Sequence, residues 1–325
     1  MKKLLSILAF LYLISFSNAS SANDNPLLSV DFLKKATPET LQQMIDKGYN
    51  INDRDLFGLT PLLYASMYNS NSKVIMILLK KGANINDRDT QGSTPLMLAS
   101  MFNSNPEVIT MLLKKGANIN DRDEYGWTPL MFASHSNSNP EVITTLLQNG
   151  ANINDRDKFG RTPLIHASSD SSNLKVIMVL LKNGSNINNR DKSGRTPLIY
   201  LISRNANPKI ILAMLKYGAN VNGRDEYGLT PLMYAIRYNA NPEIILTMLK
   251  HGANINDRDK NGWTPLMFAS RFNTNPQIIT ALLENGADVK SKDKNGKTAL
   301  DYVKGNPKIY RTDAYWQMNN LMYEK

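Results

Sequence analysis

Residues 94–127 read TPLMLASMFNSNPEVITMLLKKGANINDRDEYGW, and a closely similar stretch recurs every 34 residues along the chain. The threonine that opens each copy stands at Thr60, Thr94, Thr128, Thr162, Thr196, Thr230, Thr264 and Thr298. A fixed period of this length is typical of a solenoid, in which each repeat buries its apolar side on its neighbours. The sequence therefore predicts one elongated repeat array.

The helix-capping and turn residues within residues 94–127 predict the structure of one repeat. Thr94-Pro95 is typical of a helix start, because threonine caps free backbone N–H groups and proline suits the first helical turn. Asn105-Pro106 repeats this signal and starts a second helix, which Gly116 ends. Residues 117–126 are rich in Asn and Asp and end on glycine, as in an extended turn or finger. The predicted unit is helix, turn, helix, finger.

These residues resemble the ankyrin repeat. The pattern Gly-x-Thr-Pro-Leu, a small residue such as Ala99, and then Leu-Leu-x-x-Gly-Ala-Asn-Ile-Asn carries the resemblance over residues 53–289. The resemblance implies an all-α repeat solenoid, an ankyrin-type stack of helix-turn-helix units with β-turn or hairpin fingers. The tetratricopeptide repeat shares the 34-residue period, but its Trp/Leu-Gly/Tyr pattern is absent and it has no glycine-rich finger.

Two features depart from the family pattern. The usual ankyrin unit has one residue fewer, and the extra residue here falls in the inter-helix turn, as in Asn103-Ser104-Asn105-Pro106. The histidine expected after Thr-Pro-Leu is replaced by Leu, Met or Ile, as at Met97. Because that histidine normally ties the helix start to the neighbouring backbone, its loss puts this local hydrogen bond in doubt.

The ends of the chain differ from the repeats. Residues 1–19 have a basic start, an apolar stretch and small residues before the predicted cleavage point, as in a secretion signal. Residues 26–53 are predicted to form an N-terminal capping helix pair, residues 54–290 seven repeats, and residues 291–325 a C-terminal capping repeat. No later stretch is long and apolar enough for a membrane-spanning helix. We therefore expect an exported, monomeric protein that is periplasmic or secreted.

Composition excludes several kinds of chemistry. The chain has no cysteine, which excludes disulfides, thiolate metal sites and a cysteine nucleophile. The three histidines, at His135, His166 and His251, occupy different repeat positions, so they do not suggest a metal site. No catalytic motif was found, and every finger carries nearly the same acids. The sequence therefore predicts a non-enzymatic protein without cofactors.

The Asp-Arg-Asp motif of the fingers has two possible interpretations. Arginine recurs at Arg54, Arg88, Arg122, Arg156, Arg190, Arg224 and Arg258, with Lys292 in the last finger. In the structural interpretation, each arginine pairs with an aspartate of its own or the next repeat. In the second, the arginines form a ladder that binds carboxylates or phosphates. The alternating aspartates favour the structural interpretation, because they cancel much of the field.

The resemblance to ankyrin repeats also implies where a partner binds. In such solenoids the finger tips and the exposed ends of the first helices form the binding face, here called the tip face. The finger tips carry Phe57, Tyr125, Trp127, Phe159, Arg161, Arg195, Tyr227 and Trp263, and the first-helix ends carry Tyr68, Phe102, His135, Arg204, Arg237, Tyr238, Arg271 and Phe272. Aromatic residues and arginine dominate binding hot spots. Packing between adjacent fingers is the alternative role for these aromatic rings.

Two functions fit these observations. The first is a protein–protein interaction scaffold that acts in the periplasm or outside the cell and binds its partner on the tip face. The alternative is a binder of an anionic polymer or envelope surface, because the formal net charge is +10. The lysines lie mostly at second-helix ends, away from the tip face, where they also complement the helix dipole. We therefore expect a protein partner, with nucleic acid disfavoured.

Overall fold

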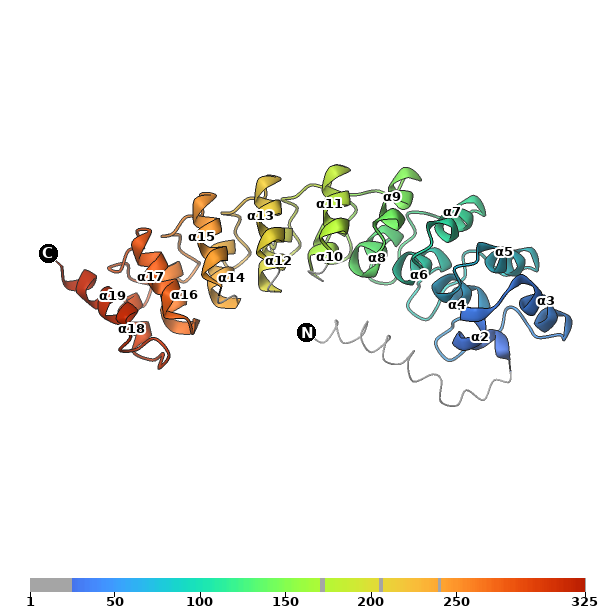
Figure 1. Cartoon of the computed structure of the whole chain (residues 1–325), viewed down its shortest axis with the longest axis horizontal. Helices are drawn as coiled ribbons and strands as arrows, with labels where there is room; N and C mark the ends of the chain where they lie inside the picture. Colours follow the sequence, from blue (N-terminus) through green and yellow to red (C-terminus); the bar gives the residue numbers. More distant parts are fainter. Residues whose placement is uncertain (1–24, 170–172, 205–206, 239–240, 325) are drawn as a thin grey trace. The chain divides into compact units, whose positions relative to one another are not determined.

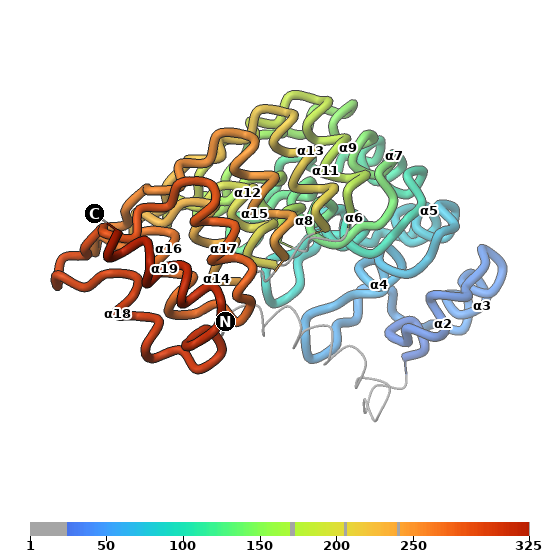
Figure 2. The backbone as a smooth tube through the Cα atoms, turned by 60° about the vertical axis from the view of Figure 1, so that its left-hand side comes forward, coloured from blue at the N-terminus to red at the C-terminus, as the bar shows by residue number. Residues whose placement is uncertain are grey.

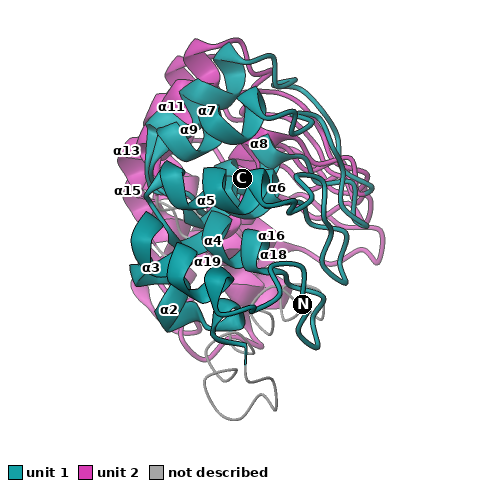
Figure 3. Ribbon diagram, turned by 90° about the vertical axis from the view of Figure 1, so that its right-hand side faces the viewer, with its two compact units in different colours: residues 1–158 teal, residues 159–325 magenta. Residues whose placement is uncertain are grey.

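The computed structural model of the chain describes residues 25–169, 173–204, 207–238 and 241–324. Every regular element in these ranges is a helix, which confirms the predicted all-α repeat solenoid (Figure 1). The predicted signal, residues 1–19, lies outside the described residues. The chain divides into two compact units, residues 1–158 and residues 159–325 (Figure 3), and each is described here by itself.

Unit 1, residues 1–158, consists of helix pairs joined by finger loops. Its elements are η1 (Pro26–Leu28), α2 (Val30–Lys35), α3 (Pro38–Asp46), α4 (Pro61–Tyr68), α5 (Ser72–Lys80), α6 (Pro95–Phe102), α7 (Pro106–Lys114), α8 (Pro129–Ser136) and α9 (Pro140–Gln148). The first helices α4, α6 and α8 pack on one another in chain order, and so do the second helices α5, α7 and α9. The fingers project from the side of the first helices that faces away from the second helices (Figure 3).

Unit 2, residues 159–325, repeats the same arrangement. Its elements are α10 (Pro163–Ser169), α11 (Leu174–Lys182), α12 (Pro197–Ser203), α13 (Pro208–Lys216), α14 (Pro231–Tyr238), α15 (Pro242–Lys250), α16 (Pro265–Phe272), α17 (Pro276–Glu284), α18 (Ala299–Val303) and α19 (Asp313–Tyr323). Consecutive first helices again pack on one another, and α19 packs against α17 and α18. Figure 2 follows the alternation of helix pair and finger along the backbone. The boundaries of the capping segments stay a prediction.

The capping signals in the sequence act as expected. The Thr94 hydroxyl accepts a hydrogen bond from the backbone N–H of Met97, and Asn105 accepts one from Glu107. Met97 also replaces the missing histidine in part, because its Sδ lies 3.4 Å from the backbone nitrogen of Thr94. The thioether is a weak acceptor. It keeps a contact at the helix start where the family's imidazole is absent.

The two helices of a repeat bury different amounts of surface. In α6 every residue from Pro95 to Met101 is buried, because the helix lies between α4 and α8. In α7 only one stripe is buried, at Val108, Ile109 and Leu112. Its other side is more polar and ends in lysines that complement the helix dipole. The first helices therefore form the core of the array, and the second helices cover it.

The inter-helix turn has a structural role. Asn103 is buried, and its side-chain amide donates to the carbonyl oxygens of Ser66 (3.1 Å) and Asn69 (2.9 Å) in the preceding repeat. Its own side-chain oxygen accepts from the backbone N–H of Asn105 at 3.0 Å. Asn137 bonds in the same way to Ser100 and Asn103. We call these residues the turn asparagines; in unit 1 they are Asn69, Asn103 and Asn137, and in unit 2 they include Asn273 and Asn306.

The fingers are turns closed by their own aspartate. In the third finger the Asp123 carboxylate accepts from the backbone N–H groups of Tyr125 (2.9 Å) and Trp127 (2.7 Å). Gly126 has a φ of +81°, and a Cβ there would lie 3.1 Å from the backbone nitrogen of Lys158 in the next finger. That nitrogen donates to the Tyr125 carbonyl at 3.0 Å. Glycine is therefore required both by the turn and by the close approach of the next finger.

Candidate partner-binding face

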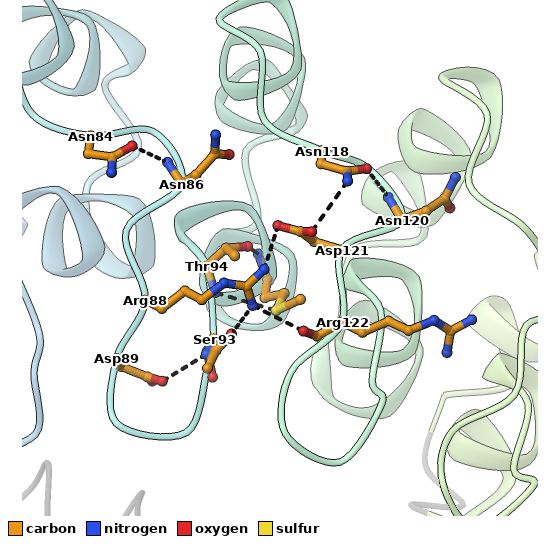
Figure 4. Close-up of polar contacts among 12 residues, drawn as sticks. Asn84, Asn86, Arg88, Asp89, Ser93, Thr94, Asn118, Asn120, Asp121 and Arg122 are labelled. Carbon is orange, nitrogen blue, oxygen red and sulfur yellow. Dashed lines mark hydrogen bonds and ion pairs between the residues drawn. The ribbon is translucent and has the colours of Figure 1, made fainter.

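The finger arginines are bound to their neighbours. Arg88 donates through Nη1 to the carbonyls of Gly92 (2.7 Å) and Arg122 (3.0 Å), and its Nη2 lies 3.0 Å from the Asp121 carboxylate (Figure 4). Arg54 and Arg122 make the same three contacts in unit 1. These donors already satisfy one carboxylate and two carbonyls. The structure therefore supports the structural interpretation of the Asp-Arg-Asp motif.

In four repeats, a tyrosine of the first helix forms a hydrogen bond with the second aspartate of the finger. A tyrosine nine residues further on donates its hydroxyl to the free carboxylate oxygen, as Tyr234 does to Asp225 at 2.8 Å. The same pairs form between Tyr64 and Asp55, Tyr200 and Asp191, and Tyr302 and Asp293. These bonds fix each finger onto the first helix behind it. The tip face is therefore held in place by the finger base.

Two fingers of unit 1 have an apolar side chain in place of this tyrosine. Leu98 and Phe132 stand nine residues after Asp89 and Asp123, and neither side chain can donate a hydrogen bond. The Oδ2 atom of Asp89 is buried without a hydrogen-bond partner. Burial raises the pKa of Asp89, and it raises the pKa of Asp123 to about 6, although backbone N–H donors oppose the shift. The two carboxylates also repel each other.

The raised pKa of Asp123 predicts a pH-dependent loss of stability. A carboxyl whose folded pKa is raised favours the folded state below its unfolded pKa, and this contribution is lost as pH rises to about 6. In the unmodified chain, ionisation of Asp123 should lower the free energy of unfolding by about 1–2 kcal/mol between pH 4 and pH 7, after allowance for solvent screening. This decrease should be absent in Asp123→Asn. Urea denaturation at each pH measures it.

Asp191→Asn is the matched control for that experiment, because the Asp191 carboxylate receives the Tyr200 hydroxyl. This variant should lose stability at neutral pH, since a hydrogen bond to a charged acceptor is worth about 1.5–3 kcal/mol. An unchanged pH profile in Asp123→Asn would show that Asp123 ionises normally in the folded chain.

The structure places Trp127 in the core, which corrects the expectation that its ring faces a partner. Its side chain is 4% exposed and packs with Met97, Met101, Met131 and Phe132. The ring meets Phe132 edge-on, with centroids 5.2 Å apart. The finger base turns this ring inward, where it covers the first helices. Trp127 therefore stabilises the fold rather than forming part of the tip face.

The other predicted tip-face residues of unit 1 are partly buried. They are Phe57, Tyr68, Phe102, Tyr125 and His135. Phe102 and Tyr125 pack against the Trp127 cluster, and the rings of Tyr68 and Phe102 lie 6.3 Å apart. Leu56, at the tip of the first finger, is 93% exposed and was missed. The repeat register could have predicted it, because Leu56 occupies the same finger-tip position as Glu124.

Unit 2 carries the most exposed rings of the predicted set. Tyr227 is 58%, Tyr238 48% and Phe272 44% exposed. Arg204, Arg237 and Arg271 are exposed, whereas Phe159, Arg161, Arg195 and Trp263 are partly buried. The Arg161 guanidinium lies 4.8 Å from the Phe159 ring centroid. The tip face of unit 2 is thus richer in arginine and in accessible aromatic surface than that of unit 1.

Five of the unit 2 side chains form a continuous group, which we call the arginine–aromatic cluster: Arg237, Tyr238, Trp263, Phe272 and Tyr302. Trp263 is stacked on Phe272 with centroids 5.8 Å apart and lies 4.3 Å from the Tyr302 ring. Arg237 covers Phe272 and Tyr238, at 5.2 and 5.4 Å from their centroids. Sequence reasoning missed Tyr302, although it stands in the register of Tyr64.

Neither a metal centre nor a membrane span is found in the parts of the chain that the structure describes. No group of three or more His, Asp or Glu side chains in those ranges is arranged to hold a metal ion. No helix in those ranges has the length and apolar character needed to cross a bilayer.

Comparison with known families agrees with the geometry. A family model described as ankyrin repeats (3 copies) matches residues 33–123, 121–191 and 171–259. A second, described as ankyrin repeats (many copies), matches residues 248–303. A search of curated proteins found no match to the chain.

Proposed function

The chain belongs to the ankyrin repeat family, and from this premise we propose that it is an exported scaffold that binds a protein partner on its tip face. Ankyrin repeats mediate protein–protein interactions, and proteins built from them are generally non-enzymatic. The proposal adds a binding face and a place of action to this general role.

The observation that carries the binding face is the exposure of Tyr227, Tyr238 and Phe272 in unit 2. Large rings cost free energy when they are left in water. Tyrosine at a surface supplies apolar area together with a hydroxyl, and it loses little conformational entropy on binding. The finger arginines, by contrast, are already engaged with neighbouring fingers. The exposed rings and the arginines beside them are therefore the groups that a partner would contact.

The place of action is proposed from residues 1–19. A basic start followed by a short apolar stretch and small residues is typical of a cleaved secretion signal. A chain without cysteine also has no thiol that could form a wrong disulfide outside the cytosol. We place the mature protein in the periplasm or outside the cell. The size of the purified mature chain, measured by mass spectrometry, would show whether cleavage follows Ala19.

Capture from the envelope fraction of the producing organism tests the scaffold function. The mature chain is immobilised, and bound proteins are identified by mass spectrometry. The triple variant Tyr227→Ala, Tyr238→Ala, Phe272→Ala should weaken capture of the partner about tenfold or more, because aromatic anchors dominate interface energy. The expected cause is lost contact and not unfolding, since all three rings are well exposed.

The matched control removes exposed side chains from the second-helix side. Tyr217 follows α13 and Leu246 lies in α15, and both are exposed. The variant Tyr217→Ala, Leu246→Ala should capture the partner as the unmodified chain does. Equal capture by the triple variant and this control would contradict the tip face as the binding surface.

A further inference from the structure

We propose that the arginine–aromatic cluster of unit 2 binds an acidic, extended protein segment that carries an aromatic or aliphatic anchor residue. This inference rests on the proposed scaffold function and names the chemistry of the partner. It starts from one juxtaposition, in which exposed cations surround a preformed apolar platform. The platform comprises Trp263, Phe272 and Tyr302, and the cations are Arg237, Arg271 and Lys297.

The platform is fixed from below. The buried Phe268 meets Trp263 edge-on, with centroids 5.2 Å apart, and it also packs against Phe272 at 6.1 Å. Tyr302 is tied to the finger base through its hydroxyl, which donates to Asp293. Rings that are already ordered lose little freedom when a partner binds. An apolar anchor side chain can therefore dock on this surface at a low entropic cost.

The cations around the platform form no ion pair in the described part of the chain, although Lys297 attracts the Asp293 carboxylate and helps to lower its pKa. Arg237 lies against Phe272, and the Lys297 ammonium lies 5.8 Å from the Tyr302 centroid. Neither they nor Arg271 is within ion-pair distance of an acid in that part. The finger arginine of the same region differs, because Arg224 is 2.7 Å from Asp257. Carboxylates from a partner would supply the missing counter-charges.

The charge of the whole unit 2 tip face has the same sign. Among the described residues, its finger tips and first-helix ends, together with the Lys297 position, carry Arg161, Lys192, Arg195, Arg204, Arg237, Lys260, Arg271, Lys294 and Lys297. Glu226 is the acid at these positions among the described residues, and Asp170, at the first-helix end after Thr162, lies outside them. Complementary potentials speed encounter and exclude partners of the same charge. The face therefore selects for an acidic partner.

Unit 1 provides an internal contrast. Its finger tips carry Leu56, Thr90, Glu124 and Lys158, so the charges nearly cancel. Its first-helix ends carry Tyr68, Phe102 and His135, without an arginine or a lysine. An acidic segment gains no electrostatic attraction there. The proposed specificity is thus a property of unit 2 alone.

The packing of the rings favours a protein segment over a nucleic acid. Single strands bind by stacking successive bases on separate aromatic faces, along a positive groove. Here the rings pack on one another at 4.3–5.8 Å, and Arg237 covers Phe272 and Tyr238. These contacts occupy ring faces on which a base would otherwise stack. The cations surround one apolar patch, which suits an anchor residue flanked by carboxylates.

Selection from a library of random peptides tests the proposal while the partner itself is unidentified. The probe is a displayed library of peptides of about 12 residues, which reach about 40 Å when extended. The full mature chain is the target, and the variant Arg237→Glu, Phe272→Ala is the counter-target. We expect enriched peptides to combine an excess of Asp and Glu with an aromatic or aliphatic residue. Their affinity for the counter-target should be at least tenfold lower.

Lys216→Glu is the control with a similar charge change. Lys216 ends α13 on the second-helix side, so this variant should bind the enriched peptides as the unmodified chain does. Melting of the counter-target, followed by circular dichroism, should stay close to that of the unmodified chain. If the counter-target is unfolded, the single variant Arg237→Glu replaces it, because this exposed side chain makes no ion pair among the described residues.

Three results would overturn the proposal: enrichment of peptides without acidic excess, no enrichment at all, or equal affinity for the counter-target. Tighter binding of single-stranded DNA, with a steep dependence on salt, would point instead to an anionic polymer as the ligand. If envelope capture still depends on Tyr227, Tyr238 and Phe272, the scaffold function stands although the acidic partner does not.

Discussion

Replacing Asn103 by alanine is expected to lower the free energy of unfolding by about 3 kcal/mol. The substitution removes the two hydrogen bonds to Ser66 and Asn69 and the one accepted from Asn105. Because Asn103 is buried, water cannot replace these partners freely. Each buried polar group left without its partner costs about 1–3 kcal/mol. Urea denaturation followed by circular dichroism measures the loss.

Asn84 provides a matched control for this substitution. It is exposed and makes a local hydrogen bond, in which its side-chain oxygen accepts from the backbone N–H of Asn86 (Figure 4). Asn84→Ala should therefore cost about 0.5–1 kcal/mol. Hydrogen exchange should also show faster opening of α4 and α6 in Asn103→Ala. Equal losses in both variants would mean that the turn asparagines do not bind the repeats together.

Trp127→Ala is expected to cost about 3–5 kcal/mol, as truncations of large buried aromatic residues do. The side chain fills a space bounded by Met97, Met131 and Phe132, and alanine would leave much of it empty. Differential scanning calorimetry and urea denaturation of the variant would show the loss. At temperatures where the variant stays folded, envelope capture should match the unmodified chain, because the contact surface in unit 2 is untouched.

Two variants distinguish a packing role from a binding role at this position. Trp127→Phe keeps most of the buried ring and should recover more than half of the stability that alanine loses. Trp316, in α19, is half exposed, so Trp316→Ala should cost about 1 kcal/mol or less. If the Trp127→Ala chain were as stable as the unmodified chain but captured less partner, Trp127 would be a partner-binding residue of the tip face.

Most of the fold could be predicted because its signals are local and repeat. Pro95 and Pro106 begin α6 and α7 where the capping pattern expects them, and Gly116 follows the end of α7. A cap acts on N–H groups within a few residues of itself. The period then carries the same assignment to every other repeat. The helical solenoid and its fingers therefore followed from one stretch of 34 residues.

The tip face was harder to predict because burial depends on contacts between repeats. Trp127 and Trp263 occupy the same position in the register, yet Trp127 is buried among methionines and Trp263 is partly exposed beside Phe272 and Tyr302. No property of either residue alone separates them. The sequence likewise places Asn103 in the inter-helix turn but does not predict its hydrogen bonds, since its partners lie more than 30 residues away. Such contacts are visible only after neighbouring repeats are stacked.

The turn asparagines and the finger arginines both reach to the adjoining repeat, at opposite ends of the helix pair. Arg88 bonds to Arg122, 34 residues away, and Asn103 bonds to Asn69 at the same separation. A duplication or deletion of one whole period leaves most of these donors facing an equivalent acceptor, although Ser171 and Asn189 depart from the pattern. A change of any other length would strip both sets of bonds at the junction. A gain or loss of one whole period would therefore preserve more of the contacts between repeats than a change of any other length.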